Sequence, residues 1–210
     1  MAFGNPSIEQ LIGGIVALLV GLTFHEFSHA YVADTLGDHR PRAMGRLTLN
    51  PIAHLDPIGA IMLVLVGFGW AKPVMVNPAA LRNGRTGLAV VAAAGPIANV
   101  VVAVLTAVVF RVLNLADVNN AFVMEVLFWV VQLNMVLAVF NLLPIPPLDG
   151  YNVALAFLPV RQAMLLSRYG QYGVFILLFL IVLSYTNSPI DPLGWILGLA
   201  SQVAFALIGA

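Results

Sequence analysis

A long apolar run that carries two histidines and a glutamate is the feature that most constrains this chain. Residues 12–22 are almost entirely apolar, and His25, Glu26 and His29 follow in the same run as an H-E-x-x-H motif. On a helix, residues i and i+4 lie on one face, so both imidazoles can reach one metal ion. Ionisable side chains at membrane depth are costly unless they have a task. The run therefore predicts a membrane helix with a metal site built into it.

The residue types in this motif indicate hydrolytic zinc chemistry. Zinc is the usual metal for two histidines and a carboxylate, with water in the open position. Glu26 directly follows His25, so it points beside the metal and can take a proton from the water that the metal activates. We expect one Zn²⁺ per chain, held by His25, His29 and a third ligand, with Glu26 as the catalytic base.

The composition indicates an integral membrane protein. The chain is 61% hydrophobic and only 9% charged, whereas a soluble domain is about half apolar and a quarter charged. The length fits a single membrane-embedded domain over residues 1–210 of a multi-pass protein in a lipid bilayer. A net charge of zero gives no indication of a nucleic-acid partner, and the absence of Cys excludes disulfides, thiolate ligands and Cys nucleophiles.

The apolar segments predict an all-α polytopic fold. At about 1.5 Å per residue, a helix of roughly 20 residues crosses a hydrocarbon core of about 30 Å. The expected spans are 8–36, 88–113, 121–143, 170–186 and 190–209. The first three, with a short helix that ends near Leu158, form a core over about 8–158. The last two, over about 170–209, are accessory.

Residues 58–71 are apolar but only about 14 residues long, which suits a re-entrant segment better than a span. A short strand could form at 47–49. If 58–71 does not cross, eight of the nine Lys and Arg lie on one side of the membrane, and only Arg111 lies opposite. The positive-inside rule makes the basic side cytoplasmic. The H-E-x-x-H motif and Asp149 then both lie toward the cytoplasm.

Several residues on the cytoplasmic side could be the third metal ligand. The candidates are Asp34, Asp38, His39, His54, Asp56 and Asp149. Asp34 and Asp38 follow the motif too closely on the same helix or its exit. Asp149 stands where three prolines break a helix, and irregular backbone at membrane depth is tolerated only where it is buried or lines a cavity. An ordinary turn with Gly150 is the alternative, and the residue pattern does not decide between Asp149 and His54.

Three motifs together resemble the signature set of the site-2 protease family of intramembrane zinc metalloproteases. They are H-E-F-S-H at 25–29, G-P-I-A-N at 95–99 and N-L-L-P-I-P-P-L-D-G at 141–150. Their order and spacing fit a three-span core, and the stretches 50–57 and 69–73 resemble a compact prokaryotic subgroup. The resemblance implies that Asp149 is the third zinc ligand. It also implies that Asn141 contacts the substrate backbone or the developing oxyanion, and that the protein lies in a prokaryotic cell membrane.

Other residues are candidates for lining the site. His54 either lies near the metal or simply bonds loop backbone. Gly95, Pro96 and Asn99 are expected to let helices pack closely and to shape the pocket beside the metal helix. The G-x-x-x-G at 194–198 could pair helices in a homo-oligomer, or serve local packing.

The expected function is that of an intramembrane zinc-dependent endopeptidase. It would hydrolyse peptide bonds in or near transmembrane segments of membrane protein substrates, as in regulated intramembrane proteolysis. A helical substrate keeps its carbonyls bonded and must unwind locally, so segments with weak helix formers should be preferred. A strand-like edge in 45–52 or 72–77 could hold the substrate extended. The competing classes are a membrane metal-binding or transport protein and an inactive relative that only binds substrate.

Overall fold

The computed structural model describes residues 7–59, 61, 69–118, 120–186 and 189–209, and its regular structure is helical. The longer helices are α1 (Ile8–Thr35), α4 (Gly84–Leu115), α5 (Ala121–Asn141), α6 (Asp149–Phe157), α7 (Val160–Tyr169), α8 (Gly173–Tyr185) and α9 (Pro192–Ile208). The short ones are α2 (Arg40–Ala43), η1 (Pro51–Ala53), η2 (Pro78–Ala80) and η3 (Gly170–Tyr172).

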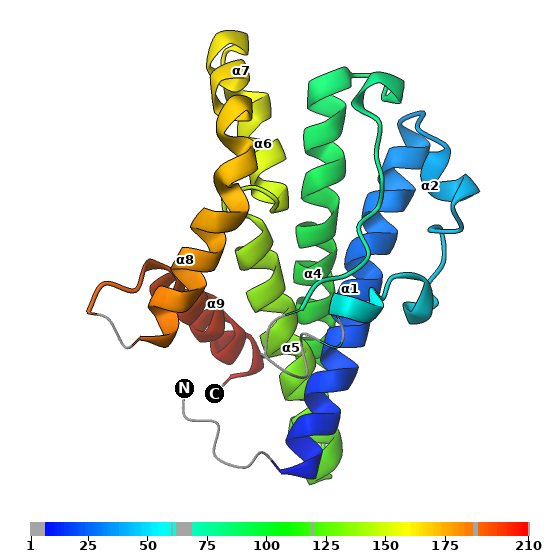
Figure 1. Ribbon diagram of the computed structural model, residues 1–210. Helices are drawn as coiled ribbons and strands as arrows, with labels where there is room; N and C mark the ends of the chain where they lie inside the picture. The colour runs from blue at the N-terminus through cyan, green and yellow to red at the C-terminus, as the bar shows by residue number, and fades with distance from the viewer. Residues whose placement is uncertain (1–6, 60, 62–68, 119, 187–188, 210) are drawn as a thin grey trace.

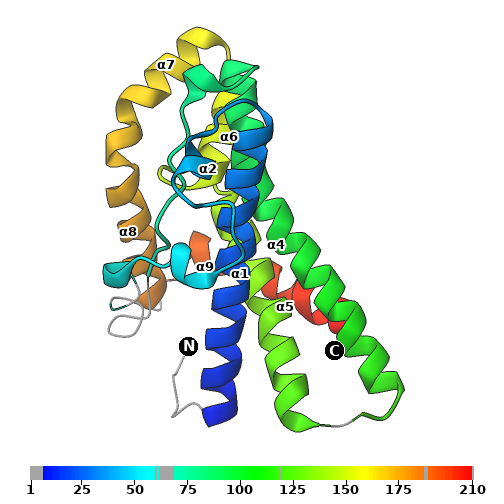
Figure 2. The same cartoon turned by 90° about the vertical axis from the view of Figure 1, so that its right-hand side faces the viewer.

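Helices α1, α4 and α5 pack on one another as the central bundle, and α6 packs beside α4 (Figures 1 and 2). Within the described part of the chain, four helical stretches are long and apolar enough to cross a membrane: Ile8–Thr35, Gly84–Leu115, Ala121–Asn141 and Val160–Tyr185. The three expected core spans thus form with nearly the expected bounds. The fourth stretch begins at Val160 rather than at 170, because α7, η3 and α8 follow one another without a break. Helix α9 is apolar but shorter.

Small residues let α1 approach α5 closely. A Cβ at Gly13 would lie 2.8 Å from the indole of Trp129. A Cβ at Gly21 would lie 2.8 Å from Leu137 and 3.2 Å from the side-chain oxygen of Asn134. Without a hydrophobic driving force between helices in lipid, such close backbone contact is a main source of packing energy. The glycines therefore fix how α1 sits against the bundle.

Helix α9 is packed onto the core bundle rather than standing apart from it. Small and aliphatic residues from three helices form one buried cluster: Ala103 and Ala107 of α4, Val131 and Met135 of α5, and Ala204 and Ile208 of α9. Arg111 of α4 also donates hydrogen bonds of 2.6 Å to the carbonyls of Leu207 and Ala206. Both carbonyls lie in the last turn of α9, where few backbone N–H groups remain to bond them. Helix α8 packs mainly on α9.

The strand expected at 47–49 does not form, and the described residues contain no strand, only an isolated bridge between Leu55 and Ala71. Side chains take the backbone partners that a strand would need. The Thr48 carbonyl accepts from His54, and the Thr48 hydroxyl accepts from the backbone N–H of Asn50. The choice between a re-entrant and a spanning 58–71 falls largely on residues 60 and 62–68, which lie outside the described residues.

The G-x-x-x-G positions of α9 have different surroundings. Gly194 lies in the first turn, where Asp191 caps the helix by accepting from the Gly194 N–H at 2.8 Å. A Cβ at Gly198 would meet nothing within 4 Å. Gly194 thus has a local capping role, and a homo-oligomer through this face stays a prediction.

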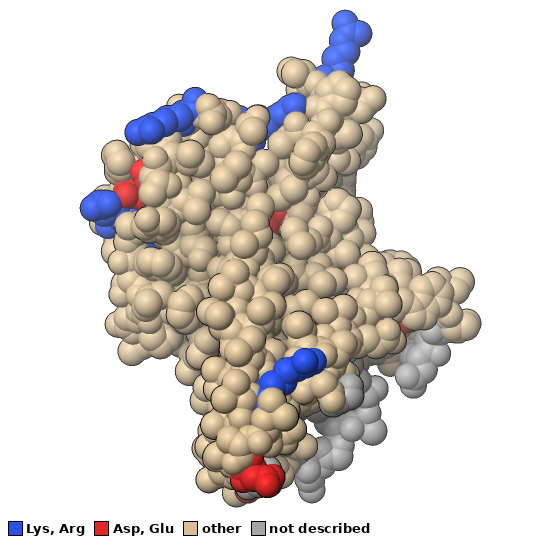
Figure 3. Space-filling view, turned by 180° about the vertical axis from the view of Figure 1, so that it is seen from behind, with Lys and Arg blue, Asp and Glu red and all other residues tan. Residues whose placement is uncertain are grey.

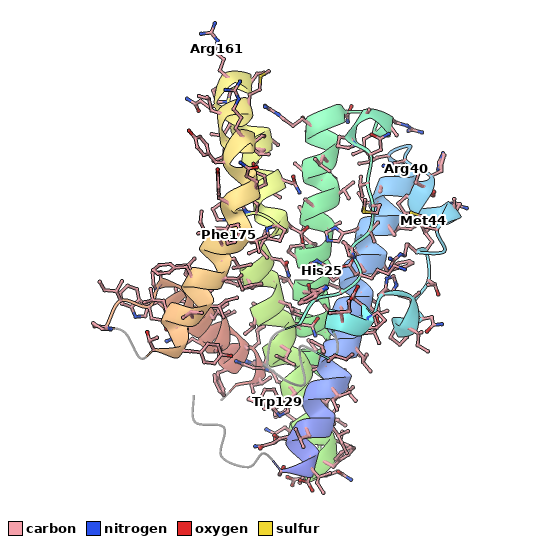
Figure 4. All side chains as sticks on the ribbon, in the orientation of Figure 1. His25, Arg40, Met44, Trp129, Arg161 and Phe175 are labelled. Carbon is pink, nitrogen blue, oxygen red and sulfur yellow. The ribbon has the colours of Figure 1, made fainter. Side chains whose placement is uncertain are left out.

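Charge is distributed unevenly along the bundle. In Figure 3, most of the visible Lys and Arg lie at one end of a largely uncharged surface, and one basic side chain lies toward the other end. In Figure 4, Arg40 and Arg161 lie at the more basic end, Trp129 lies toward the other end, and His25 lies between them. Arg111, by contrast, sits near the C-terminal end of α4. The basic residues therefore mark one end of the molecule.

Candidate active site

The H-E-x-x-H motif lies on the inward face of α1. The helix starts with a capping box, in which the Ser7 hydroxyl accepts from the Gln10 N–H and the Gln10 side chain accepts from the Ser7 N–H. One turn separates His25 from His29, so their rings meet edge to face with centroids 4.5 Å apart. Both histidines are buried, with 6% and 8% of their surface exposed. The local helix alone thus brings two imidazoles together.

Asp149 reaches the histidine pair from a distant part of the chain. Helix α5 ends at Asn141, a proline-rich turn follows, and Asp149 is the first residue of α6. A Cβ at Gly150 would collide with the carbonyls of Leu142 and Leu143. Only glycine at this position therefore lets α6 start against the end of α5. The Asp149 Oδ2 atom then lies 3.1 Å from His25 Nε2 and 3.3 Å from His29 Nε2.

The hydrogen bonds around the two histidines leave their Nε2 atoms free for a metal. His29 Nδ1 lies 2.7 Å from the Val91 carbonyl, and His25 Nδ1 lies 2.7 Å from Asn99 Oδ1. A carbonyl oxygen only accepts, so the Nδ1 atom facing Val91 carries the proton and Nε2 keeps its lone pair. The two Nε2 atoms are 3.0 Å apart.

These atoms fit a metal ion better than they fit one another. Asp149 Oδ2 is buried and lies near both Nε2 atoms, but it has no hydrogen-bond partner among the described residues, although a buried carboxylate oxygen normally has one. Among the described residues, His25, His29 and Asp149 are the group whose ligand atoms lie within 4.8 Å of one another. Two imidazole nitrogens and a carboxylate oxygen, with an open fourth position, are the donor set of a catalytic zinc site.

Helix α4 contributes the space beside this group. A Cβ at Gly95 would lie 2.5 Å from His29 Nε2 and 2.7 Å from His25 Nε2. Pro96 follows and has no N–H to donate within the helix. Asn99 lies one turn after Gly95, on the same side of α4, and faces the site. Gly95 and Asn99 therefore both lie against the histidine pair, as expected for a pocket beside the metal helix.

A groove of about 690 Å³ contains the three converging residues together with Glu26 and Asn141. Glu26 is 8% exposed, and its Oε2 accepts from the Val74 N–H at 3.3 Å. Asn141 donates to the Leu137 carbonyl through Nδ2. Apolar side chains of α4, α5 and the irregular segment 69–78 form most of the walls, with Leu177 of α8. A second groove of about 710 Å³ between α1 and α4 contains none of the five polar residues.

The segment 72–77, which runs alongside α1 and α4 (Figure 1), is held at both ends by buried charged residues. Arg46 donates to the Lys72 carbonyl at 3.2 Å, and Asp38, only 1% exposed, accepts from the Asn77 N–H at 2.6 Å. The Arg40 guanidinium beside Asp38 lowers the pKa of that carboxyl to about 2, and the Asn77 N–H adds to the effect. The Asp38 anchor therefore stays charged at any physiological pH.

The other ligand candidates lie away from the converging group. Asp34 is paired with Arg42 and His39, at 2.6 Å and 2.9 Å. His54 is buried, and its Nε2 donates to the Thr48 carbonyl at 2.8 Å. It does not line the groove. This geometry corresponds to the alternative in which His54 bonds loop backbone, and a role for His54 at the metal stays a prediction.

Sequence comparison supports the same chemistry. A sequence model described as peptidase family M50 matches residues 109–184, which include Asn141 and Asp149. The "Putative zinc metalloprotease YwhC" of Bacillus subtilis (strain 168) is 39% identical over 180 residues, covering 80% of this chain and 79% of YwhC. The chain belongs to peptidase family M50, the site-2 proteases. This site-2 protease is accordingly a zinc metalloprotease, which confirms the family and the enzyme class predicted from the sequence.

More distant relatives agree with this assignment. Rip2 of Mycolicibacterium smegmatis, also named as a zinc metalloprotease, is 31% identical over 178 residues, covering 82% of this chain and 68% of Rip2. Rip3 of Mycobacterium tuberculosis (strain H37Rv) is 29% identical over 217 residues, which cover 98% of this chain but only 44% of Rip3. No solved structure matches the chain.

Two parts of this M50 peptidase support the site in ways that its sequence did not predict. Asn134 of α5 is fully buried and bonds Asn99. A polar residue inside an otherwise apolar span was the available signal. Asp38 was considered only as a metal ligand, and Arg46 lies in no motif, so only the fold reveals that they hold the segment beside Glu26.

Proposed function

We propose that this site-2 protease hydrolyses peptide bonds in or near transmembrane segments of membrane protein substrates, as one membrane-embedded domain. The observation that carries the proposal is the convergence of His25, His29 and Asp149 beside Glu26, in a mainly apolar groove among membrane-spanning helices. One zinc ion would be held by His25, His29 and Asp149. When bound, zinc would lower the pKa of water and polarise the scissile carbonyl.

Glu26 is the proton carrier in this proposal. Its carboxylate takes a proton from the attacking water and later donates it to the amine that leaves when the peptide bond breaks. The Val74 N–H holds Glu26 Oε2 in the groove before the reaction. Asn141 has one amide hydrogen not used by Leu137, and this hydrogen can bond the substrate carbonyl as negative charge develops on its oxygen.

The substrate binds in an extended conformation along the segment 72–77. Residues 74–76 make no backbone-to-backbone hydrogen bond with any described residue. Apart from the Val74 N–H, which bonds Glu26, their N–H and C=O groups can therefore pair with a substrate strand. The apolar walls of the groove accept apolar side chains. Unwinding a membrane helix leaves its polar backbone unbonded, so weak helix formers near the scissile bond lower the cost of binding.

The groove opens toward the cytoplasm of a prokaryotic cell in this proposal. Eight of the nine Lys and Arg belong to the segments 37–57, 72–87 and 144–169, and most of those visible in Figure 3 lie at one end of the molecule. The positive-inside rule assigns such an end to the cytoplasm. The relatives YwhC and Rip2 are bacterial.

The metal content of the purified protein tests the ligand set. Wild type should hold about one zinc ion per chain, and His25→Ala and Asp149→Ala should each lose it, because two ligands bind far more weakly than three. His54→Ala is the matched control and should keep the zinc. Elemental analysis of the detergent-purified variants gives the result. Loss with His54→Ala but not with Asp149→Ala would refute the assignment of Asp149.

The position of the cut tests the substrate class. Wild type reconstituted in vesicles with a single-span substrate should cut within or beside the apolar segment, as located by mass spectrometry. Replacing three leucines of that segment with Gly, Gly and Pro should raise the cleavage rate about tenfold or more, because each Gly costs a helix about 1 kcal/mol and Pro about 3 kcal/mol. A substrate with the same changes outside the segment is the control. Cuts confined to soluble loops would contradict the proposal.

A further inference from the structure

Two fully buried asparagines connect the metal helix to the rest of the bundle. Asn99 of α4 and Asn134 of α5 are both 0% exposed. Asn99 Nδ2 lies 3.0 Å from the Gly21 carbonyl and 2.9 Å from Asn134 Oδ1, and Asn134 Nδ2 lies 2.8 Å from the Val130 carbonyl. At its other end, Asn99 Oδ1 lies 2.7 Å from His25 Nδ1. The hydrogen bonds therefore run without a gap from α5 to His25.

The direction of every bond in this series follows from its ends. The carbonyls of Val130 and Gly21 can only accept, so the amide nitrogens of Asn134 and Asn99 must face them. Asn134 then offers its oxygen to Asn99, and Asn99 offers its oxygen to His25. His25 Nδ1 must carry the proton that this oxygen accepts.

We propose that Asn134 is a positioning residue for the metal site, acting through Asn99 to fix the tautomer and the ring orientation of His25. The inference rests on the proposed zinc site, and it goes beyond it because Asn134 touches neither the metal ligands nor the groove. Partners that hold the second nitrogen of a ligating histidine set its tautomer and its orientation.

The two histidines differ in how they are held. His29 Nδ1 bonds a main-chain carbonyl, that of Val91, which no side-chain substitution removes. His25 depends on the side-chain amide of Asn99, which could rotate and present its nitrogen instead. Asn134, together with the Gly21 carbonyl, opposes that rotation, because a rotated Asn99 would place its amide oxygen against two acceptors, the Gly21 carbonyl and Asn134 Oδ1. His25 is therefore the ligand that responds to changes at Asn134.

The test compares three variants with wild type. Asn134→Leu removes the acceptor for Asn99, and it should weaken zinc binding roughly 10–100-fold. Asn134→Asp should stay within a few-fold of wild type, since a neutral carboxyl group can donate to Val130 and accept from Asn99. Gln132→Leu is the matched control on α5: Gln132 bonds Ser201 of α9 and has no bond to Asn99 or His25. It should leave zinc affinity unchanged.

Two readouts separate positioning from simple stabilisation. Zinc affinity is measured by competition with a chelator, and the ligand geometry by the visible absorption of the Co²⁺-substituted protein. If Asn134 only stabilised the bundle, its substitution would lower the unfolding temperature and leave zinc affinity and the cobalt spectrum as in wild type. Asn134→Ser, whose hydroxyl can bond the Val130 carbonyl but is too short to reach Asn99, should weaken zinc binding in the same way and replaces Asn134→Leu if that variant does not fold.

The outcomes distinguish a failure of the positioning role of Asn134 from a failure of the zinc site. Wild-type zinc affinity and an unchanged cobalt spectrum in Asn134→Leu, or in Asn134→Ser, would overturn the positioning role while leaving the zinc site intact. Weakened binding in Gln132→Leu to the same extent would also overturn it, since any loss of polarity in α5 would then suffice. A wild-type protein that binds no zinc would overturn the proposed site itself.

Discussion

Glu26→Gln should lower the rate of substrate cleavage by about 10²–10⁴-fold, the usual contribution of general acid–base catalysis, while the zinc content stays that of wild type. The amide has nearly the shape of the carboxylate, but it cannot accept the proton of the attacking water. Glu26 lies beside the converging ligands without belonging to the group whose atoms meet. Cleavage of a reconstituted membrane substrate and elemental analysis of the same preparation give the two results.

Glu125→Gln is the matched control for this prediction. Glu125 is also a carboxylate within a membrane helix, and its Oε1 accepts from the Trp129 indole at 2.9 Å. An amide oxygen can accept the same bond, and Glu125 does not line the groove. Cleavage should therefore stay close to wild type. Cleavage by Glu26→Gln within a few-fold of wild type would show that another group carries the proton.

Gly95→Ala should reduce the zinc content from about one per chain to nearly none, if the ligand set is that of a catalytic zinc site. The new methyl group would occupy the space 2.5 Å from His29 Nε2 and 2.6 Å from His25 Cε1. Neither ring can swing aside freely, because each Nδ1 is held by a hydrogen bond of 2.7 Å. Elemental analysis and chelator competition measure the loss.

The helix itself should tolerate this substitution. Alanine favours a helix by about 0.5–1 kcal/mol over glycine, so helix content measured by circular dichroism should not fall. Gly14→Ala is the control, since a Cβ at Gly14 would meet nothing within 4 Å, and it should keep its zinc. Full zinc occupancy in Gly95→Ala would contradict the placement of the metal beside α4.

Local sequence was sufficient to predict those features that depend on interactions between residues close together in the chain. The spacing of His25 and His29 puts them on one face of any helix, and the helix itself follows from the apolar run around them. The same reasoning predicted α1, α4 and α5 with ends within about four residues of those observed. It failed at 47–49, where side chains of His54 and Thr48 take up the backbone groups of the expected strand.

Local patterns did not decide whether Asp149 or His54 is the third metal ligand. The resemblance to the site-2 protease family favoured Asp149. Asp149 follows the histidines by more than a hundred residues, and no periodicity connects them. The structure brings Asp149 to 3.1 Å from His25 because Gly150 lets α6 start against the end of α5. His54 instead bonds Thr48 within its own loop.

By itself, the sequence determined that this chain crosses a membrane by helices, that one of them carries two histidines and a glutamate on a single turn, and that the basic residues cluster in a few connecting segments. These properties depend on composition and on spacings of a few residues. Only the tertiary structure decided that Asn134 holds Asn99, that Asn99 holds His25, and that α9 packs onto α4 and α5. The physical reason is that a buried polar group must find a partner, but nothing in its neighbouring residues says which distant helix will provide it.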